Sequence, residues 1–232
     1  MAKDRIRQEW EATERYIRNT GRTGRLFKLD KDKTAMVVVD MQNRFVDPKA
    51  ALGVPSARGI VPNINALTKA CRSVTIPVIW LASKRRYDIE AGLIAVLQPK
   101  SPVGNQRSSV FEEAMWEDDG VKIWPEVDID PEKDYEIVKY RYSAFIPGSS
   151  HLERVLRALG KDTLIIVGTV TNVCVAATVM DAMMLDFKVI VVSDGTAAVT
   201  DFLQQSCLMS LKMVFADVTT TDDLLTEIKG LK

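Results

Sequence analysis

From residue 34 onward, short apolar runs alternate with longer stretches in which apolar residues recur at helical spacing. Apolar runs rich in β-branched residues are typical of strands buried on both faces of a sheet. Strands are therefore predicted at residues 35–39, 77–82, 135–138, 163–167, 188–193 and 213–216. Helices are predicted at residues 60–74, 152–159, 175–185, 198–211 and 221–229.

This alternation predicts an α/β fold with three layers, in which helices cover both faces of a central, mostly parallel sheet of about six strands. Residues 83–133 are irregular, with glycines and prolines around short helical stretches. The chain has 232 residues, of which 47% are hydrophobic, so it can bury a full core in a single domain. We assign that domain to residues 34–232.

Residues 1–33 form a charged extension ahead of the domain. The extension contains a predicted surface helix, because Ile6, Trp10, Thr13 and Ile17 fall on one helical face. An amphipathic helix of this length needs a partner for its apolar stripe, either the core of its own chain or a neighbouring subunit. We predict a homo-oligomer whose assembly weakens when residues 1–30 are removed.

The charge of the chain is balanced, with 31 Lys and Arg residues against 31 Asp and Glu residues. No basic stripe with interleaved aromatic residues is present, so the sequence does not favour nucleic-acid binding. No apolar run approaches the ~18 residues of a membrane span, and the N-terminus lacks a signal-peptide core. Three scattered cysteines indicate reduced thiols, so we expect a soluble, cytoplasmic protein without a membrane partner.

The sequence contains a single histidine, His151, and no paired Cys or His motif of the kind that binds zinc. A site for magnesium or calcium made of carboxylates alone remains open, although no EF-hand or P-loop pattern supports one. We therefore predict no metal and no cofactor.

Cys174 lies at a strand-to-helix junction, after the apolar run 164–167 and the turn 168–173. A thiol at the start of a helix meets the positive end of the helix dipole and unpaired backbone N–H groups. Both lower a thiol pKa and stabilise an oxyanion, which nucleophilic acyl transfer requires. The alternative is a small apolar residue, buried where a helix packs on a sheet.

Asp40 and Lys139 each end a predicted strand, as Cys174 follows one. In an open parallel sheet, sites form beyond the carboxyl ends of the strands, so these three side chains are expected to converge there. A carboxylate can take the thiol proton, while an ammonium lowers the pKa of both groups. Taken singly, Asp40 can be a strand-end cap and Lys139 one solvated charge among many.

Three stretches around these residues, VDMQNRF at 39–45, KYRYSAF at 139–145 and GTVTNVC at 168–174, resemble the signature stretches of the isochorismatase-like cysteine hydrolases. The similarity extends from about residue 34 to residue 225. The resemblance implies the Rossmann-like topology of that family.

The resemblance also implies a catalytic triad made of Asp40, Lys139 and Cys174. It implies a cis peptide bond between Thr169 and Val170, which turns the Val170 N–H toward the Cys174 N–H to form an oxyanion hole. A cis bond before a residue other than proline costs about 3–4 kcal/mol and persists only where its surroundings enforce it.

Departures from the family's subgroups narrow the activity that the resemblance implies. Nicotinamidases usually carry histidines that bind a metal, and residues 47–63 contain no histidine. Isochorismatases proper cleave a vinyl ether without the cysteine, so Cys174 favours hydrolysis of an amide or ureide. The chain is most similar to the ureidoacrylate and N-carbamoyl amidohydrolase branch. This implies a metal-independent amidohydrolase that cleaves a small ureido or N-carbamoyl acid through a thioester, releasing ammonia and carbon dioxide.

A ureido acid carries a carboxylate, which a bidentate arginine recognises best. The candidates are Arg85 and Arg86, just after the second predicted strand, Arg107 in the irregular segment, and Arg141, two residues beyond Lys139. Arg141 can instead pair with a carboxylate at the edge of the sheet.

Other side chains near the predicted strand ends can complete a substrate pocket. Asn43 and Gln42 can orient an amide, with the alternative that Gln42 only holds the backbone near Asp40. Phe45 and Tyr142 are the aromatic candidates for the pocket wall, although aromatic residues are more often core.

Two other functions remain open. One is a plain carboxamidase of the nicotinamidase or maleamate type. The other is a catalytically inert module that serves as an oligomeric scaffold or a small-molecule binder. For the leading function the expected partner is a small molecule, and the resemblance implies a homodimer or homotetramer.

Overall fold

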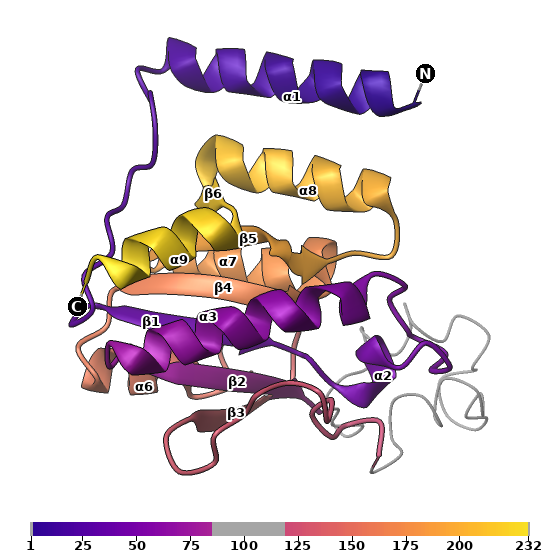
Figure 1. The fold of residues 1–232 in the computed structure, drawn as a ribbon, viewed down its shortest axis with the longest axis vertical. Coiled ribbons are helices and arrows are strands. Elements are labelled where there is room, and N and C mark those ends of the chain that lie inside the picture. The colour runs from indigo at the N-terminus through magenta and orange to yellow at the C-terminus, as the bar shows by residue number, and fades with distance from the viewer. Residues whose placement is uncertain (1, 85–118, 232) are drawn as a thin grey trace.

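The computed structural model describes residues 2–84 and 119–231. Within them, six strands form one sheet in the order β3-β2-β1-β4-β5-β6, and each neighbouring pair is parallel (Figure 1). The strands are β1 Thr34–Val39, β2 Val78–Ser83, β3 Tyr135–Lys139, β4 Thr163–Thr169, β5 Lys188–Ala197 and β6 Asp217–Thr219. The predicted parallel sheet is confirmed.

Helices cover both faces of this sheet, which confirms the predicted three layers (Figure 1). The helices α3 and α9 pack on one face, and α6, α7 and α8 pack on the other. The helical elements are α1 Ala2–Asn19, α2 Asn43–Val46, the 3₁₀ turn η1 Ala57–Ile60, α3 Val61–Ser73, α6 Leu152–Ala158, the π-turn η2 Thr171–Val175, α7 Ala176–Met184, α8 Asp201–Val214 and α9 Thr221–Lys229.

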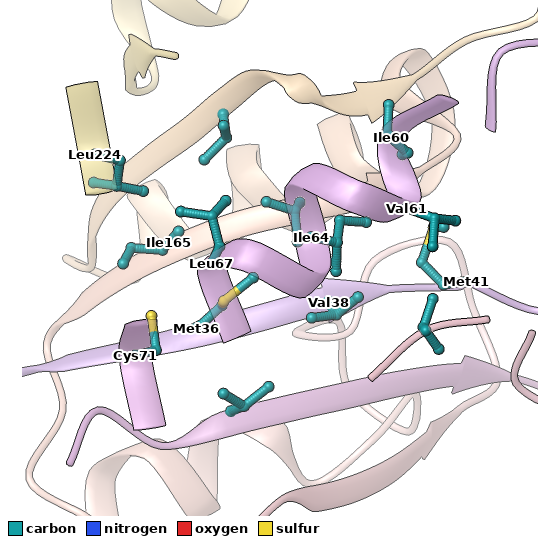
Figure 2. Close-up of a cluster of buried hydrophobic side chains, with 14 of the residues drawn as sticks. Met36, Val38, Met41, Ile60, Val61, Ile64, Leu67, Cys71, Ile165 and Leu224 are labelled. Atoms are coloured by element: carbon teal, nitrogen blue, oxygen red, sulfur yellow. The ribbon is translucent and has the colours of Figure 1, made fainter. Parts of the chain in front are cut away.

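The central strand β1 is buried on both faces, as its unbroken apolar run predicts. Met36 and Val38 face α3, where Ile64 and Leu67 pack against them (Figure 2). The alternate residues of β1 join the second core, on the side of α6, α7 and α8. Apolar side chains therefore pack against β1 from both faces of the sheet, and this packing fixes the position of its C-terminal end.

The strand predicted at residues 213–216 is wrong. Helix α8 continues to Val214, and the last strand begins only at Asp217. The buried carboxylate of Asp217 accepts hydrogen bonds from the N–H groups of Leu26 and Phe27, at 2.8 and 2.9 Å. Asp217 is thus held by the chain that precedes β1, a partnership that no local pattern can reveal.

The predicted N-terminal helix is present as α1, and it packs on α8 of its own chain, outside the three layers (Figure 1). Trp10 Nε1 donates a hydrogen bond to Gln205 Oε1 at 3.0 Å, and the Lys212 ammonium pairs with Glu14. Ile17 is buried. Of the two positions that the sequence left open, the structure therefore supplies a partner for the stripe within the same chain.

The structure also bears on membrane crossing in residues 2–84 and 119–231. There, no helix has both the length and the apolar character that spanning a bilayer requires.

Candidate active site

The strand order reverses between β1 and β4, and open parallel sheets place their sites at such a point, beyond the carboxyl ends of the strands. Asp40 directly follows β1, Lys139 is the last residue of β3, and Cys174 lies in η2, just after β4. The structure brings these three side chains together, although more than 130 positions separate the first from the last.

Asp40 and Lys139 form a buried ion pair. Asp40 Oδ2 lies 2.8 Å from Lys139 Nζ, and neither side chain is exposed to solvent. Lys139 Nζ also donates a hydrogen bond to the Arg141 carbonyl at 3.1 Å. Burial lowers the pKa of Lys139, but its interactions with Asp40 and then with Cys174 outweigh this effect, so the net pKa is raised. The lysine is therefore an ammonium at neutral pH.

The thiol of Cys174 is buried beside both charges. Its pKa is raised to about 12, mainly by burial, and the negative charge of Asp40 raises it further. The ammonium of Lys139 acts in the opposite direction and lowers it. At neutral pH the resting group is thus a protonated thiol, and a thiolate can form only if a neighbouring base accepts the proton.

The backbone around Asp40 is held in an uncommon conformation. Asp40 has a φ of +48°, a left-handed value that aspartate tolerates better than most residues. Its N–H donates to the Leu81 carbonyl at 3.0 Å, and its carbonyl accepts from Thr169 Oγ1 at 2.7 Å. These bonds tie the end of β1 to β2 on one side and to β4 on the other.

Gly168 allows β4 to approach β1 closely at this point. Its φ is +111°, and a Cβ at this position would lie 2.1 Å from the Val39 carbonyl oxygen. Any side chain would therefore push the two strand ends apart, immediately beside Asp40. Glycine is the residue that this part of the site requires.

The peptide bond between Thr169 and Val170 is cis, at the position that the family resemblance implied. Val170 precedes η2, and its carbonyl accepts a hydrogen bond from the Val173 N–H at 2.9 Å. Cys174 follows within the same turn, close to the start of the helix that η2 and α7 form together.

Four of the predicted substrate-binding residues lie in the part of the chain that the structure describes. Asn43 and Phe45 lie on α2, where Asn43 Nδ2 donates to the Asp119 carbonyl at 2.9 Å and Phe45 packs against the core. Tyr142 packs against the other core, and Arg141 Nη1 donates to the Tyr140 carbonyl at 2.9 Å. The remaining candidates, Arg85, Arg86 and Arg107, lie outside the described residues.

Gln42 has the backbone role that the sequence left as an alternative. It is fully buried, its Oε1 accepts from the Ser83 N–H at 3.0 Å, and its Nε2 donates to the Val121 carbonyl at 2.6 Å. Sequence reasoning missed Arg44, which is only 2% exposed and donates to the Ser83 carbonyl and to Gln42. A buried arginine gives no signal in a sequence, because arginine is usually at the surface.

His151 is exposed, immediately before α6, whereas the side chains of Asp40 and Lys139 are fully buried. Across residues 2–84 and 119–231, no three His, Cys, Asp or Glu side chains gather in the way a metal ion would need.

The isochorismatase domain model matches residues 34–223 of the chain. A ureidoacrylate amidohydrolase of Pseudomonas savastanoi pv. phaseolicola is 30% identical over 217 residues, which cover 86% of this chain and 85% of that protein. A protein of Arabidopsis thaliana described as a probable inactive nicotinamidase is 30% identical over 196 residues, covering 84% of this chain and 96% of that protein.

Solved structures lead to the same family. The crystal structure of a cysteine hydrolase from Pseudomonas syringae pv. phaseolicola matches with a TM-score of 0.79 at 30% identity, covering 91% of this chain and 99% of that chain. The chain therefore belongs to the isochorismatase family of hydrolases.

Proposed function

We propose that this protein is a metal-independent cysteine amidohydrolase with Asp40, Lys139 and Cys174 as its catalytic residues. The proposed reaction cleaves a C–N bond of a small ureido or N-carbamoyl acid and releases ammonia and carbon dioxide.

One observation carries the proposal: a buried thiol, a carboxylate and an ammonium meet where the sheet order reverses. Packing of the core does not account for this cluster, because burial of three ionisable groups costs desolvation free energy that apolar side chains would not. Perturbed, mutually interacting groups of this kind are typical of catalytic sites. The single histidine of the chain is exposed, whereas Asp40 is buried beside the thiol, so Asp40 is the better candidate for the base.

In the first proposed step, Asp40 accepts the thiol proton and the sulfur of Cys174 attacks the carbonyl carbon of the substrate. The N–H groups of Val170 and Cys174 donate to the oxyanion that forms. The protonated Asp40 then returns its proton to the departing nitrogen, so the C–N bond breaks and ammonia leaves. Lys139 stays charged throughout and holds the carboxylate beside the sulfur.

The second step hydrolyses the thioester. Asp40 takes a proton from a water molecule, the resulting hydroxide adds to the carbonyl carbon, and the C–S bond breaks with return of the proton to sulfur. With a ureido acid the product is a carbamic acid, which decomposes to an amine and carbon dioxide. One water is consumed for each ammonia released in hydrolysis, and the enzyme returns to its resting thiol.

The choice of substrate rests on the relatives. The Pseudomonas savastanoi relative is a ureidoacrylate amidohydrolase, and its similarity covers most of both chains. The Arabidopsis thaliana relative is described as a probable inactive nicotinamidase. The test must therefore distinguish the proposed activity from that of a carboxamidase and from a protein with no activity.

The test measures ammonia released from small ureido acids and N-carbamoyl amino acids, beside nicotinamide and maleamate, each with and without EDTA. We expect turnover of the ureido and N-carbamoyl acids, unchanged by EDTA, and none in Cys174→Ser or Cys174→Ala. Release from the carboxamides alone would indicate the carboxamidase, and no release from any compound would indicate an inert protein. More than a few per cent of wild-type activity in either cysteine variant would exclude the covalent mechanism.

A further inference from the structure

The turn η2, which carries Cys174, is attached to helix α8 by a side chain that the proposed mechanism does not use. Thr171, the first residue of η2, donates a hydrogen bond from its Oγ1 to Gln204 Oε1 at 2.6 Å. Gln204 lies in the first turns of α8, more than 30 positions along the chain.

The amide nitrogen of Gln204 is also hydrogen-bonded. Its Nε2 lies 3.1 Å from the carbonyl oxygens of Ser193 and Thr196 and 3.1 Å from Thr196 Oγ1, all on β5. An amide nitrogen donates and an amide oxygen accepts, so only this orientation of the side chain matches its partners. Gln204 therefore bridges β5 and the start of η2 in one fixed geometry.

A second contact from α8 reaches the same residue. Cys207 lies one helical turn after Gln204, and its Sγ is 3.4 Å from the Thr171 carbonyl oxygen. Helix α8 thus contacts both the side chain and the backbone of Thr171. This residue stands between the cis peptide bond at Thr169–Val170 and the thiol of Cys174.

We infer that Gln204 is a positioning residue: it fixes the turn Thr171–Val175 so that the sulfur of Cys174 stays against Asp40 and Lys139. The inference rests on the proposed function, since it assigns Gln204 to the support of the proposed nucleophile. Displacement of a reacting group by about 1 Å can cost on the order of 10²-fold in rate, so a support of this kind has a measurable effect.

The test replaces the interaction in three ways. Gln204→Leu keeps the size of the side chain but removes its hydrogen bonds, and the adjoining cavity of about 380 Å³ leaves room for it. Thr171→Val removes the hydroxyl, whereas Thr171→Ser keeps it. Gln205→Leu is the matched control, because Gln205 is the next residue of α8 and bonds to Trp10 and Asp201 rather than to η2.

Two measurements are made on each variant: kcat and KM for the best substrate, and the rate of alkylation of Cys174 by iodoacetamide between about pH 7 and pH 10. We expect Gln204→Leu and Thr171→Val to lower kcat about 10–100-fold with little change in KM. In both variants alkylation should become faster at a given pH, because burial is the main cause of the raised thiol pKa and a loosened turn admits water. Thr171→Ser and Gln205→Leu should resemble wild type.

A double variant that combines Gln204→Leu with Thr171→Val should be no worse than Gln204→Leu alone, since Gln204→Leu already removes the hydrogen bond that Thr171→Val removes. The inference is overturned if Gln204→Leu and Thr171→Val match Gln205→Leu in both kcat and alkylation profile. If Gln204→Leu does not fold, the pair Thr171→Val and Thr171→Ser decides by the same criteria. Turnover retained by Cys174→Ser would instead refute the proposed function, and the alkylation profiles would still test the placement of the thiol.

Discussion

At the scale of single residues, the thiol of Cys174 is acted on by two charges of opposite sign. Asp40 raises its pKa and Lys139 lowers it, and burial raises it more than either. Loss of the carboxylate and loss of the ammonium should therefore change the reactivity of the thiol in opposite directions. Turnover, which needs both groups in the proposed mechanism, should fall in either case.

Asp40→Asn should lower kcat by about 10²–10⁴, because it keeps the shape of the side chain but removes the base. The same variant should speed alkylation of Cys174 at pH 8, because it removes a charge that raises the pKa of the thiol. Steady-state kinetics and iodoacetamide labelling of the same preparation check both parts. Near-normal turnover would move the base to another residue, with His151 the first to test.

Lys139→Met should slow alkylation of Cys174 at pH 8, since the variant loses the cation that lowers the pKa of the thiol. It should also lower the free energy of unfolding by about 3–5 kcal/mol, because the fully buried carboxyl group of Asp40 loses its ion-pair partner. Urea denaturation measures the second effect. A labelling curve that superimposes on that of wild type would show that Lys139 does not act on the thiol.

The sequence places the three residues of this cluster correctly because each ends or follows an apolar run, and parallel strands bring such positions to one edge. The same reasoning cannot find Arg44 or Gln204. Both are polar residues whose partners lie in other segments: Ser83 for Arg44, and Thr171 with β5 for Gln204. Their burial follows from packing between segments, which a local pattern does not encode.

At the scale of elements, β3 comes first in the order of the described strands and ends at Lys139. Asp134 is the residue just before β3. Its side chain is 1% exposed and pairs with Arg72 of α3 through two bonds, at 2.5 and 2.9 Å. Trp80 Nε1 of β2 donates to the same carboxylate at 2.8 Å. The start of β3 is therefore attached to a helix and to the neighbouring strand.

Arg72→Met should destabilise the protein by about 3–5 kcal/mol, because the buried carboxylate of Asp134 loses its cation. The matched control is Arg7→Gln, which breaks an exposed pair with Glu11 on α1 and should cost no more than about 0.5 kcal/mol. Urea denaturation of both variants gives the comparison. Equal effects would mean that Arg72 does not anchor β3.

Strands and helices were predictable where hydrophobic periodicity is strong, as in β1 and α9, and less so where an apolar run spans two elements. Residues 213–216 read as a strand because three of the four are large and apolar, yet they fall at the end of α8 and just after it. Met213 and Val214 are 40% and 54% exposed, so they do not fill a core at all. Their apolar character misled the prediction, because a strand is defined by backbone pairing with its neighbours, whereas the N–H groups of Phe215 and Ala216 donate to the Leu211 carbonyl of α8.

At the scale of the whole molecule, burial of a thiol makes the free energy of unfolding depend on pH in the alkaline range. Cys71 lies on the buried face of α3 (Figure 2), and burial raises its pKa from 9.0 to about 12, with Arg72 acting in the opposite direction. Below pH 9 the thiol is protonated in both the folded and the unfolded chain. Between pH 9 and pH 12 only the unfolded chain ionises, so the folded state loses stability as pH rises.

This linkage gives Cys71 a slope of about 1.4 kcal/mol per pH unit within that window. Cys71→Ala should be less stable than wild type at pH 7, because it leaves a small cavity, but its stability should fall less steeply above pH 9. Urea denaturation at half-unit steps from pH 7 to pH 11 measures the difference between the two proteins. A difference that does not change with pH would show that Cys71 ionises equally in both states.

Helix α1 bears on assembly as well as stability, since the apolar stripe of the N-terminal extension was the sequence argument for a homo-oligomer. In the structure Trp10 and Ile17 pack within their own chain, so the stripe no longer requires a second subunit. A homodimer or homotetramer remains our prediction from the family resemblance, but residues 1–30 need not hold it together.

Deletion of residues 1–19 should therefore lower the thermal midpoint and leave the mass in solution unchanged. The loss of stability follows from the exposure of the α8 surface that α1 covers and from the loss of the pairs at Gln205 and Lys212. Arg22 is retained in this deletion, because it donates to the buried carboxylate of Asp217 at 2.5 Å and its removal would add a separate cost. Trp10→Ala in the full-length chain is the control for the packing contribution alone. Light scattering and a thermal melt on all three proteins decide between the two roles of α1: dissociation of an oligomer on deletion would place α1 at a subunit interface.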